Sequence, residues 1–158
     1  MSHGDKAPQP SPGEALHRLK EGHLAYLAGG TVAHDIGSER RSAVAQSQSP
    51  MAVIVCCSDS RVPPEILFGR GLGELFVIRN AGNTIDAVAM GSLEYAIAVF
   101  STPLVVVLGH QRCGAVSAAL SVVDTGAVFP GSIGPMVEPI IPAVLDAHRA
   151  GAADLLDA

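Results

Sequence analysis

Three short, largely apolar runs divide the chain, and each one ends in polar or glycine-containing sequence. The runs cover residues 51–56, 74–78 and 104–108. Runs of this length without polar alternation are typical of strands that are buried on both faces, as in a parallel sheet. The pattern therefore predicts three buried parallel strands.

Between these runs, apolar residues recur at the spacing of helices. The first such segment starts at Glu14 and ends at Gly29 and Gly30, and Gly22 leaves open whether it is one helix or two short ones. Further helical segments are predicted near 38–46, 63–67, 85–100, 115–123 and 137–149. Strands that alternate with helices in this way predict an α/β fold, with a parallel-sheet core and flanking helices.

The polar, proline-rich N-terminus lies outside this pattern. Residues 1–13 contain no apolar stretch of the kind that a signal peptide needs, and we expect them to form a disordered tail. Residues 14–158 have the length of one ordinary domain.

Composition excludes several classes of partner. The net charge is −5 and there is no basic run, which argues against a nucleic-acid partner. No apolar run is long enough to span a membrane.

The odd count of 3 cysteines argues against a disulfide framework, so we expect a reducing, cytoplasmic setting. With 48% hydrophobic and only 16% charged residues, the chain is expected to bury part of its surface between subunits.

Reactive side chains follow the first and third apolar runs. Cys57 ends the first run, and His110 and Cys113 come directly after the third. If the first strand lies between the other two, the carboxyl ends of strands one and three flank the point where ligands bind in open α/β sheets. Two thiolates and one imidazole are a common zinc set with an open position. The alternative is that Cys57 is a small core residue, as we expect for Cys56 within the strand.

Asp59 and Arg61 stand beside this cluster and have two interpretations. They could form an ordinary ion pair on a strand-end loop. Arg61 could instead orient the Asp59 carboxylate and keep it ionised. Asp59 would then accept a hydrogen bond from zinc-bound water or hydroxide, or bind the metal itself as a fourth ligand.

Two motifs resemble those of the β-class carbonic anhydrases: CSDSR at residues 57–61 and GHxxCG at residues 109–114. The resemblance extends from about Leu16 to Ala119. It implies a zinc enzyme that interconverts CO₂ and bicarbonate, with one Zn²⁺ per chain. Cys57, His110 and Cys113 match the zinc ligands of that family, and Asp59 and Arg61 match its catalytic dyad. In some members the aspartate moves onto the zinc and closes the site.

The resemblance also implies an oligomer. Gln48, Phe76 and Tyr95 match substrate-binding positions that the neighbouring subunit contributes in plant-type members, so we expect a homodimer or a higher even oligomer. For Phe76 and Tyr95 the alternative is ordinary core packing.

The sequence also departs from the family pattern. Residues 22–26 read GHLAY where the family often carries GNxRF, and the arginine is absent. The family continues past residue 158 with further strands, so we expect a C-terminally truncated domain whose third strand is an exposed edge. Two alternatives to CO₂ hydration follow: a truncated zinc-binding chain without activity, or a hydrolase of carbonyl sulfide or carbon disulfide on the same fold.

Overall fold

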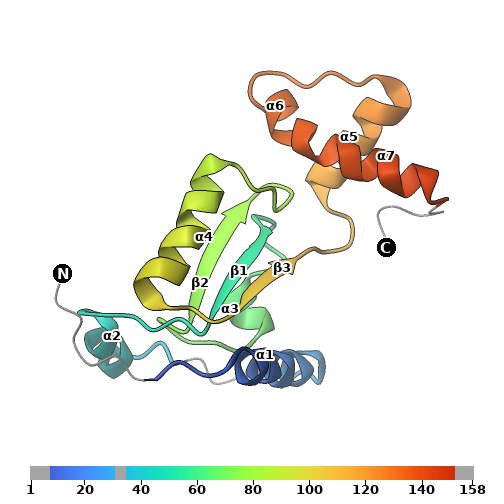
Figure 1. Cartoon of the computed structure of the whole chain (residues 1–158). Coiled ribbons are helices and arrows are strands. Elements are labelled where there is room, and N and C mark those ends of the chain that lie inside the picture. The colour runs from blue at the N-terminus through green and yellow to red at the C-terminus, as the bar shows by residue number, and fades with distance from the viewer. Residues whose placement is uncertain (1–7, 31–34, 152–158) are drawn as a thin grey trace.

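A three-stranded parallel sheet forms the centre of the computed structural model, which describes residues 8–30 and 35–151. Its strands are β1 (Ala52–Cys57), β2 (Leu75–Asn80) and β3 (Val105–Leu108), in the order β2-β1-β3 (Figure 1). The prediction of three parallel strands is confirmed, and the first strand lies in the middle, which was the condition for a ligand site at the ends of β1 and β3. In register, Cys57 lies opposite Asn80 on β2, and Cys56 lies opposite Leu108 on β3. The carboxyl ends of β1 and β3 therefore lie at the same edge of the sheet.

Helices flank the sheet on both faces because successive side chains of a strand point to opposite sides. Val53 and Val55 of β1 pack with Ala89 and Ala96 of α4, whereas the alternate residues Ala52, Ile54 and Cys56 pack with Ala15 and Leu19 of α1. The helices are α1 (Pro12–Leu27), α2 (Ser38–Val44), α3 (Pro64–Leu67), α4 (Ala87–Phe100), α5 (Gly114–Thr125), α6 (Ile133–Val137), the 3₁₀ helix η1 (Glu138–Ile140) and α7 (Ile141–Arg149).

Helix α1 is continuous and begins earlier than predicted. Ser11 caps it, accepting a hydrogen bond from the amide of Glu14, whose carboxylate accepts one from the amide of Ser11. The predicted start at Glu14 is therefore two residues late, and residues 12–13 are helical. The division into a tail and one domain stays a prediction, since residues 1–7 lie outside the described residues.

Gly22 does not interrupt α1, so the alternative of two short helices is wrong. A methyl group at this position would overlap the carbonyl oxygen of Phe68, at the end of α3. Glycine is needed here because two backbones approach closely, and the local sequence pattern gives no sign of that contact.

Strand β3 is less buried than its apolar sequence predicts. Val105 is 39% exposed and Val107 is 64% exposed. Within the described residues β3 pairs only with β1, so its other edge is free. This arrangement confirms the exposed edge that was expected for the third strand.

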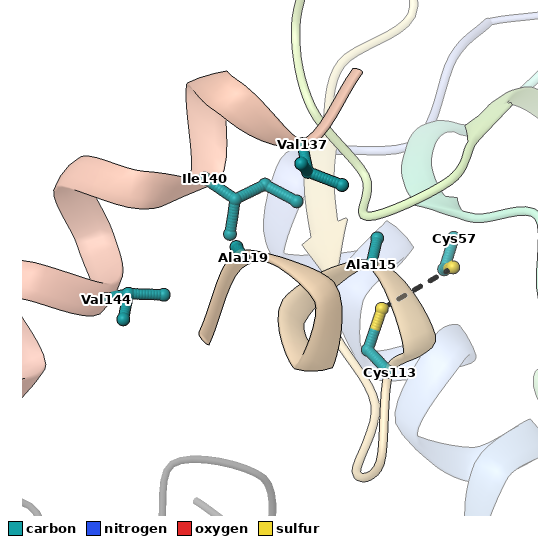
Figure 2. Packing of buried hydrophobic residues seen from close by; sticks show 7 residues of the cluster. All are labelled: Cys57, Cys113, Ala115, Ala119, Val137, Ile140 and Val144. Carbon is teal, nitrogen blue, oxygen red and sulfur yellow. Dashed lines mark hydrogen bonds between the residues drawn. The ribbon is translucent and has the colours of Figure 1, made fainter. Parts of the chain in front are cut away.

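The last helices form a cluster of their own beyond the strand ends, coloured orange to red in Figure 1. The single helix predicted near 137–149 is divided into η1 and α7, which have prolines in their first turns, and it is preceded by the short helix α6. Apolar residues of α5, η1 and α7 pack together and extend to Cys57 and Cys113 (Figure 2). Among the described residues, every helix is too short or too polar to cross a membrane.

Candidate metal centre

Two sulfur atoms and one imidazole meet where β1 and β3 end. Cys57 is the last residue of β1, His110 lies in the turn after β3, and Cys113 caps the N-terminus of α5. One ligand atom from each of the three lies within 4.8 Å of the others. The two sulfurs are 3.8 Å apart (Figure 2). The strand order β2-β1-β3 thus brings together residues that are far apart in the sequence.

His110 presents a nitrogen suited to a metal. Its Nδ1 lies 2.9 Å from the carbonyl oxygen of Gln111, which can only accept, so Nδ1 carries the proton. Its Nε2 is buried and has no hydrogen-bond partner among the described residues. A buried nitrogen without a partner costs free energy, and a metal ion bound beside the two sulfurs would remove that cost.

The thiol of Cys57 is prepared to ionise. Burial acts to raise its pKa, but a hydrogen bond from the backbone amide of Gly82, together with the nearby side chains of His110 and Cys113, lowers the pKa to about 7. The thiolate is the form that binds a metal. Burial instead raises the pKa of the Cys56 thiol, which is fully buried within β1, in line with its predicted core role.

Asp59 and Arg61 form a two-pronged ion pair beside these ligands. Arg61 donates from Nε to Oδ1 of Asp59 at 2.9 Å and from Nη2 to Oδ2 at 2.7 Å. These hydrogen bonds, together with that from the Arg61 backbone amide, hold the pKa of the Asp59 carboxyl well below its usual range. Oδ2 of Asp59 lies 4.0 Å from Nε2 of His110. An ionised carboxylate is thus fixed next to the three ligand atoms.

A cleft of about 620 Å³ opens onto this group. His110 and Cys113 contribute to its lining on the side of the strand ends, and Val116, Ile140 and Ala143 contribute apolar side chains from the last helices. The cleft gives a small, weakly polar molecule access to the ligand atoms.

Comparison with known proteins agrees with this geometry. A family model described as Carbonic anhydrase matches residues 52–156. The chain belongs to the carbonic anhydrase family. It is 46% identical to the Carbonic anhydrase of Mycolicibacterium smegmatis and 44% identical to Carbonic anhydrase 2 of Mycobacterium tuberculosis. Each alignment covers 91% of this chain and 70% of the relative.

Solved structures place the chain in the β class. The β-carbonic anhydrase of Coccomyxa, in complex with acetazolamide, is 30% identical with a TM-score of 0.62, over 94% of this chain and 63% of that one. The enzyme CafA of Aspergillus fumigatus is 26% identical with a TM-score of 0.66, over 92% and 65%. Tetrameric β-carbonic anhydrases of Sordaria macrospora share the fold at 22% identity, with a TM-score of 0.66 over 91% and 69%.

Gln48, Phe76 and Tyr95 are not among the residues of this carbonic anhydrase chain that line the cleft at its metal centre. The ring centroids of Phe76 on β2 and Tyr95 on α4 lie 6.4 Å apart, and both rings pack near Phe100. Tyr95 is 52% exposed, and Gln48 is also exposed. Phe76 and Tyr95 belong to an aromatic cluster on the α4 side of the sheet, and their role in substrate binding stays a prediction.

The sequence analysis assigned no role to two residues at the end of β2 and in the turn that follows it, Arg79 and Gly82. Arg79 donates to the carbonyl oxygens of Cys57 and Asp59, and the amide of Gly82 donates to the sulfur of Cys57. Both lie in the RNAGN segment at residues 79–83, at the carboxyl end of β2. Their place at the same sheet edge as Cys57 is the one signal that could have identified them, because backbone partners leave no mark in a sequence.

Proposed function

We propose that this carbonic anhydrase is a zinc enzyme that reversibly hydrates CO₂ to bicarbonate and a proton. One observation carries the proposal. The ligand atoms of Cys57, His110 and Cys113 lie within 4.8 Å of one another, next to a carboxylate that Arg61 holds in place. Two sulfurs and a histidine nitrogen without a partner fit Zn²⁺ better than Mg²⁺ or Ca²⁺, which prefer oxygen ligands.

The three side chains would hold one Zn²⁺ per chain and leave a coordination position open. When bound, zinc supplies the Lewis acidity that makes water a nucleophile near neutral pH. The hydrogen bond from Nδ1 of His110 to the carbonyl oxygen of Gln111 supports this role, because it leaves Nε2 as the nitrogen that could bind the metal.

Asp59 would orient the attacking oxygen. An ionised carboxylate can only accept hydrogen bonds, so Asp59 would accept the O–H of the nucleophile and turn a lone pair toward the carbon of CO₂. Arg61 keeps Asp59 charged and in position, and it also donates to the carbonyl oxygen of Arg112 at 3.2 Å. The apolar side chains of Val116 and Ile140 in the cleft suit a substrate without charge.

Asp59 could also close the site by binding the metal as a fourth ligand. In the present arrangement both of its carboxylate oxygens accept hydrogen bonds from Arg61. Neither oxygen is among the ligand atoms that lie within 4.8 Å of one another, so closure would require the Asp59 carboxylate to move toward the metal, and the arrangement described is the one that suits the open state.

We also propose a homodimer or a higher even oligomer. Helix α4 is apolar around most of its surface and exposes Val88 at 77%, Met90 at 44% and Ile97 at 45%. A helix that is apolar on its outer face is typical of one buried against another element. Contact between subunits on this side would allow Gln48, Phe76 and Tyr95 to complete the neighbouring site. The three cysteines are all free thiols, which suits a reducing compartment such as the cytoplasm.

The test combines native mass spectrometry with stopped-flow CO₂ hydration. We expect an even oligomer with one zinc per chain, and rapid hydration. In Asp59→Asn the zinc should be retained while kcat falls by about 10²-fold or more, the range for a lost acid–base group. Asp146→Asn is the matched control, since Asp146 forms an exposed surface pair with Arg149.

Each outcome separates the alternatives. Full activity of Asp59→Asn would remove the role of the dyad. A zinc-loaded oligomer without hydration would support the zinc-binding chain without this activity, and the same preparation would then be assayed with carbonyl sulfide and carbon disulfide. A metal-free chain would overturn the proposal.

A further inference from the structure

A backbone amide points at one of the two sulfurs. The N–H of Gly82 donates to Sγ of Cys57, with the nitrogen 3.5 Å from the sulfur. Gly82 is buried in the turn after β2 and has φ +83°, a conformation that favours glycine. The turn thus supplies a hydrogen bond to a predicted zinc ligand without using a side chain.

The last helices leave no room for a side chain at this turn. A Cβ at position 82 would lie 2.6 Å from Cδ1 of Ile140 and 2.9 Å from Cβ of Ala115. Ile140 ends η1 and is 9% exposed, and Ala115 lies in the first turn of α5, two residues after Cys113. Both belong to the buried cluster that contains Cys57 and Cys113 (Figure 2). Packing by α5 and η1 therefore encloses the turn that carries the Gly82 amide.

We propose that Gly82 is a positioning residue for the metal centre, held in place by Ile140 and Ala115. The inference rests on the proposed function, because it concerns the zinc that Cys57 would bind. A hydrogen bond to a thiolate withdraws electron density from the sulfur and weakens its donation to the metal. With two thiolate ligands the metal retains less positive charge than with three histidines, and the Gly82 amide offsets part of that loss.

Cobalt substitution provides a test that does not depend on activity. The chain is loaded with Co²⁺ and its sulfur-to-cobalt charge-transfer absorption is recorded for the wild type and for Gly82→Ala. Loss of the hydrogen bond makes the sulfur easier to oxidise, so the band of Gly82→Ala should move to longer wavelength. Gly29→Ala is the matched control, because Gly29 also has a positive φ, of +71°, and a Cβ at this position meets nothing within 4 Å.

A second substitution tests the role of Ile140. Ile140→Val removes Cδ1, the atom that a methyl group at position 82 would approach most closely. In the double variant Gly82→Ala/Ile140→Val the band should return part of the way toward its wild-type position. No return would show that Ile140 does not hold the turn, and that part of the proposal would be discarded.

Nuclear magnetic resonance of the wild type tests the same hydrogen bond without a variant that has to fold. In protein loaded with ¹¹³Cd, a hydrogen bond to the ligand sulfur should give a scalar coupling between the Gly82 amide proton and the metal. Absence of this coupling, or an unchanged cobalt band in Gly82→Ala, would overturn the inference and leave the proposed function intact. Failure of the wild type to bind any of these metals would instead overturn the proposed function.

Discussion

Arg79 holds the backbone of the Cys57 loop from the neighbouring strand. It donates from Nε to the carbonyl oxygen of Cys57 at 2.9 Å and from Nη2 to that of Asp59 at 2.7 Å. One guanidinium thus joins the residue that supplies a sulfur ligand to the residue that supplies the carboxylate. The fork shape of arginine allows it to reach both oxygens at once.

Replacing Arg79 with lysine should loosen this loop. In Arg79→Lys a single ammonium group cannot reproduce the two parallel bonds, and a hydrogen bond from a charged donor contributes about 1.5–3 kcal/mol. Because Arg79 is exposed, we expect a loss of unfolding free energy near the lower end of that range, together with faster loss of zinc to a chelator. Denaturant unfolding and chelator competition measure the two effects. Arg41→Lys on the exposed surface of α2 is the control, and equal behaviour of the two variants would contradict the prediction.

The stability of the metal-free protein should increase with pH between about 7 and 9. The pKa of Cys57 is about 7 in the folded chain, against an ordinary value of 9.0, so the unfolded state binds this proton more tightly. The stabilisation is complete above the unfolded pKa and is lost as the pH falls through the folded pKa. Denaturant unfolding across this range, after removal of zinc, measures the increase. The Cys57→Ser variant has no group at this position that titrates between pH 7 and 9. If its stability increased with pH as much as that of the wild type, the increase would come from another group.

Gly22 should tolerate no side chain, in contrast to a glycine of the same helix. In Gly22→Ala the methyl group would overlap the carbonyl oxygen of Phe68, and the backbone of α1 or α3 must move. Overpacking of this kind lowers the free energy of unfolding by about 1–3 kcal/mol. We expect the upper end of that range for Gly22→Ala, because the atom it would overlap belongs to the backbone. A Cβ at Gly13 meets nothing within 4 Å, so Gly13→Ala should be neutral or slightly stabilising. Thermal unfolding of both variants decides whether this contact is needed.

A charge on the free edge of β3 should reduce aggregation. Val107 is 64% exposed on an edge strand, and such edges can pair with other chains. Val107→Lys should lower light scattering during heating and leave the melting temperature within a few degrees of the wild type. Val128→Lys adds the same charge at a residue that is 92% exposed outside the sheet, which separates the edge effect from net charge. A large fall in melting temperature for Val107→Lys alone would mean that a partner covers this edge.

Much of the fold could be predicted because its elements have strong local patterns. The apolar runs around β1, β2 and β3 are short and uniform, and the helical spacing over 85–100 matches α4 within two residues. Boundaries were less accurate where a tertiary contact or cap decides them. In the sequence Gly22 looks like a helix breaker, whereas in the structure it allows the close approach of the Phe68 backbone. Ser11 starts α1 earlier than predicted through the hydrogen bonds of its capping box with Glu14, which form only in the folded helix.

The candidate metal centre also has features that the sequence predicts and features that it does not. The sequence by itself determined the chemistry, because two thiols, an imidazole and a carboxylate–guanidinium pair are properties of residue type and of their position after apolar strands. Only the tertiary structure decided how these groups are tuned. The hydrogen bonds from Gly82 to the sulfur of Cys57, from Arg79 to two carbonyl oxygens and from His110 to Gln111 all use backbone atoms. Backbone atoms are the same in every residue, so their partners become visible only when the chain has folded.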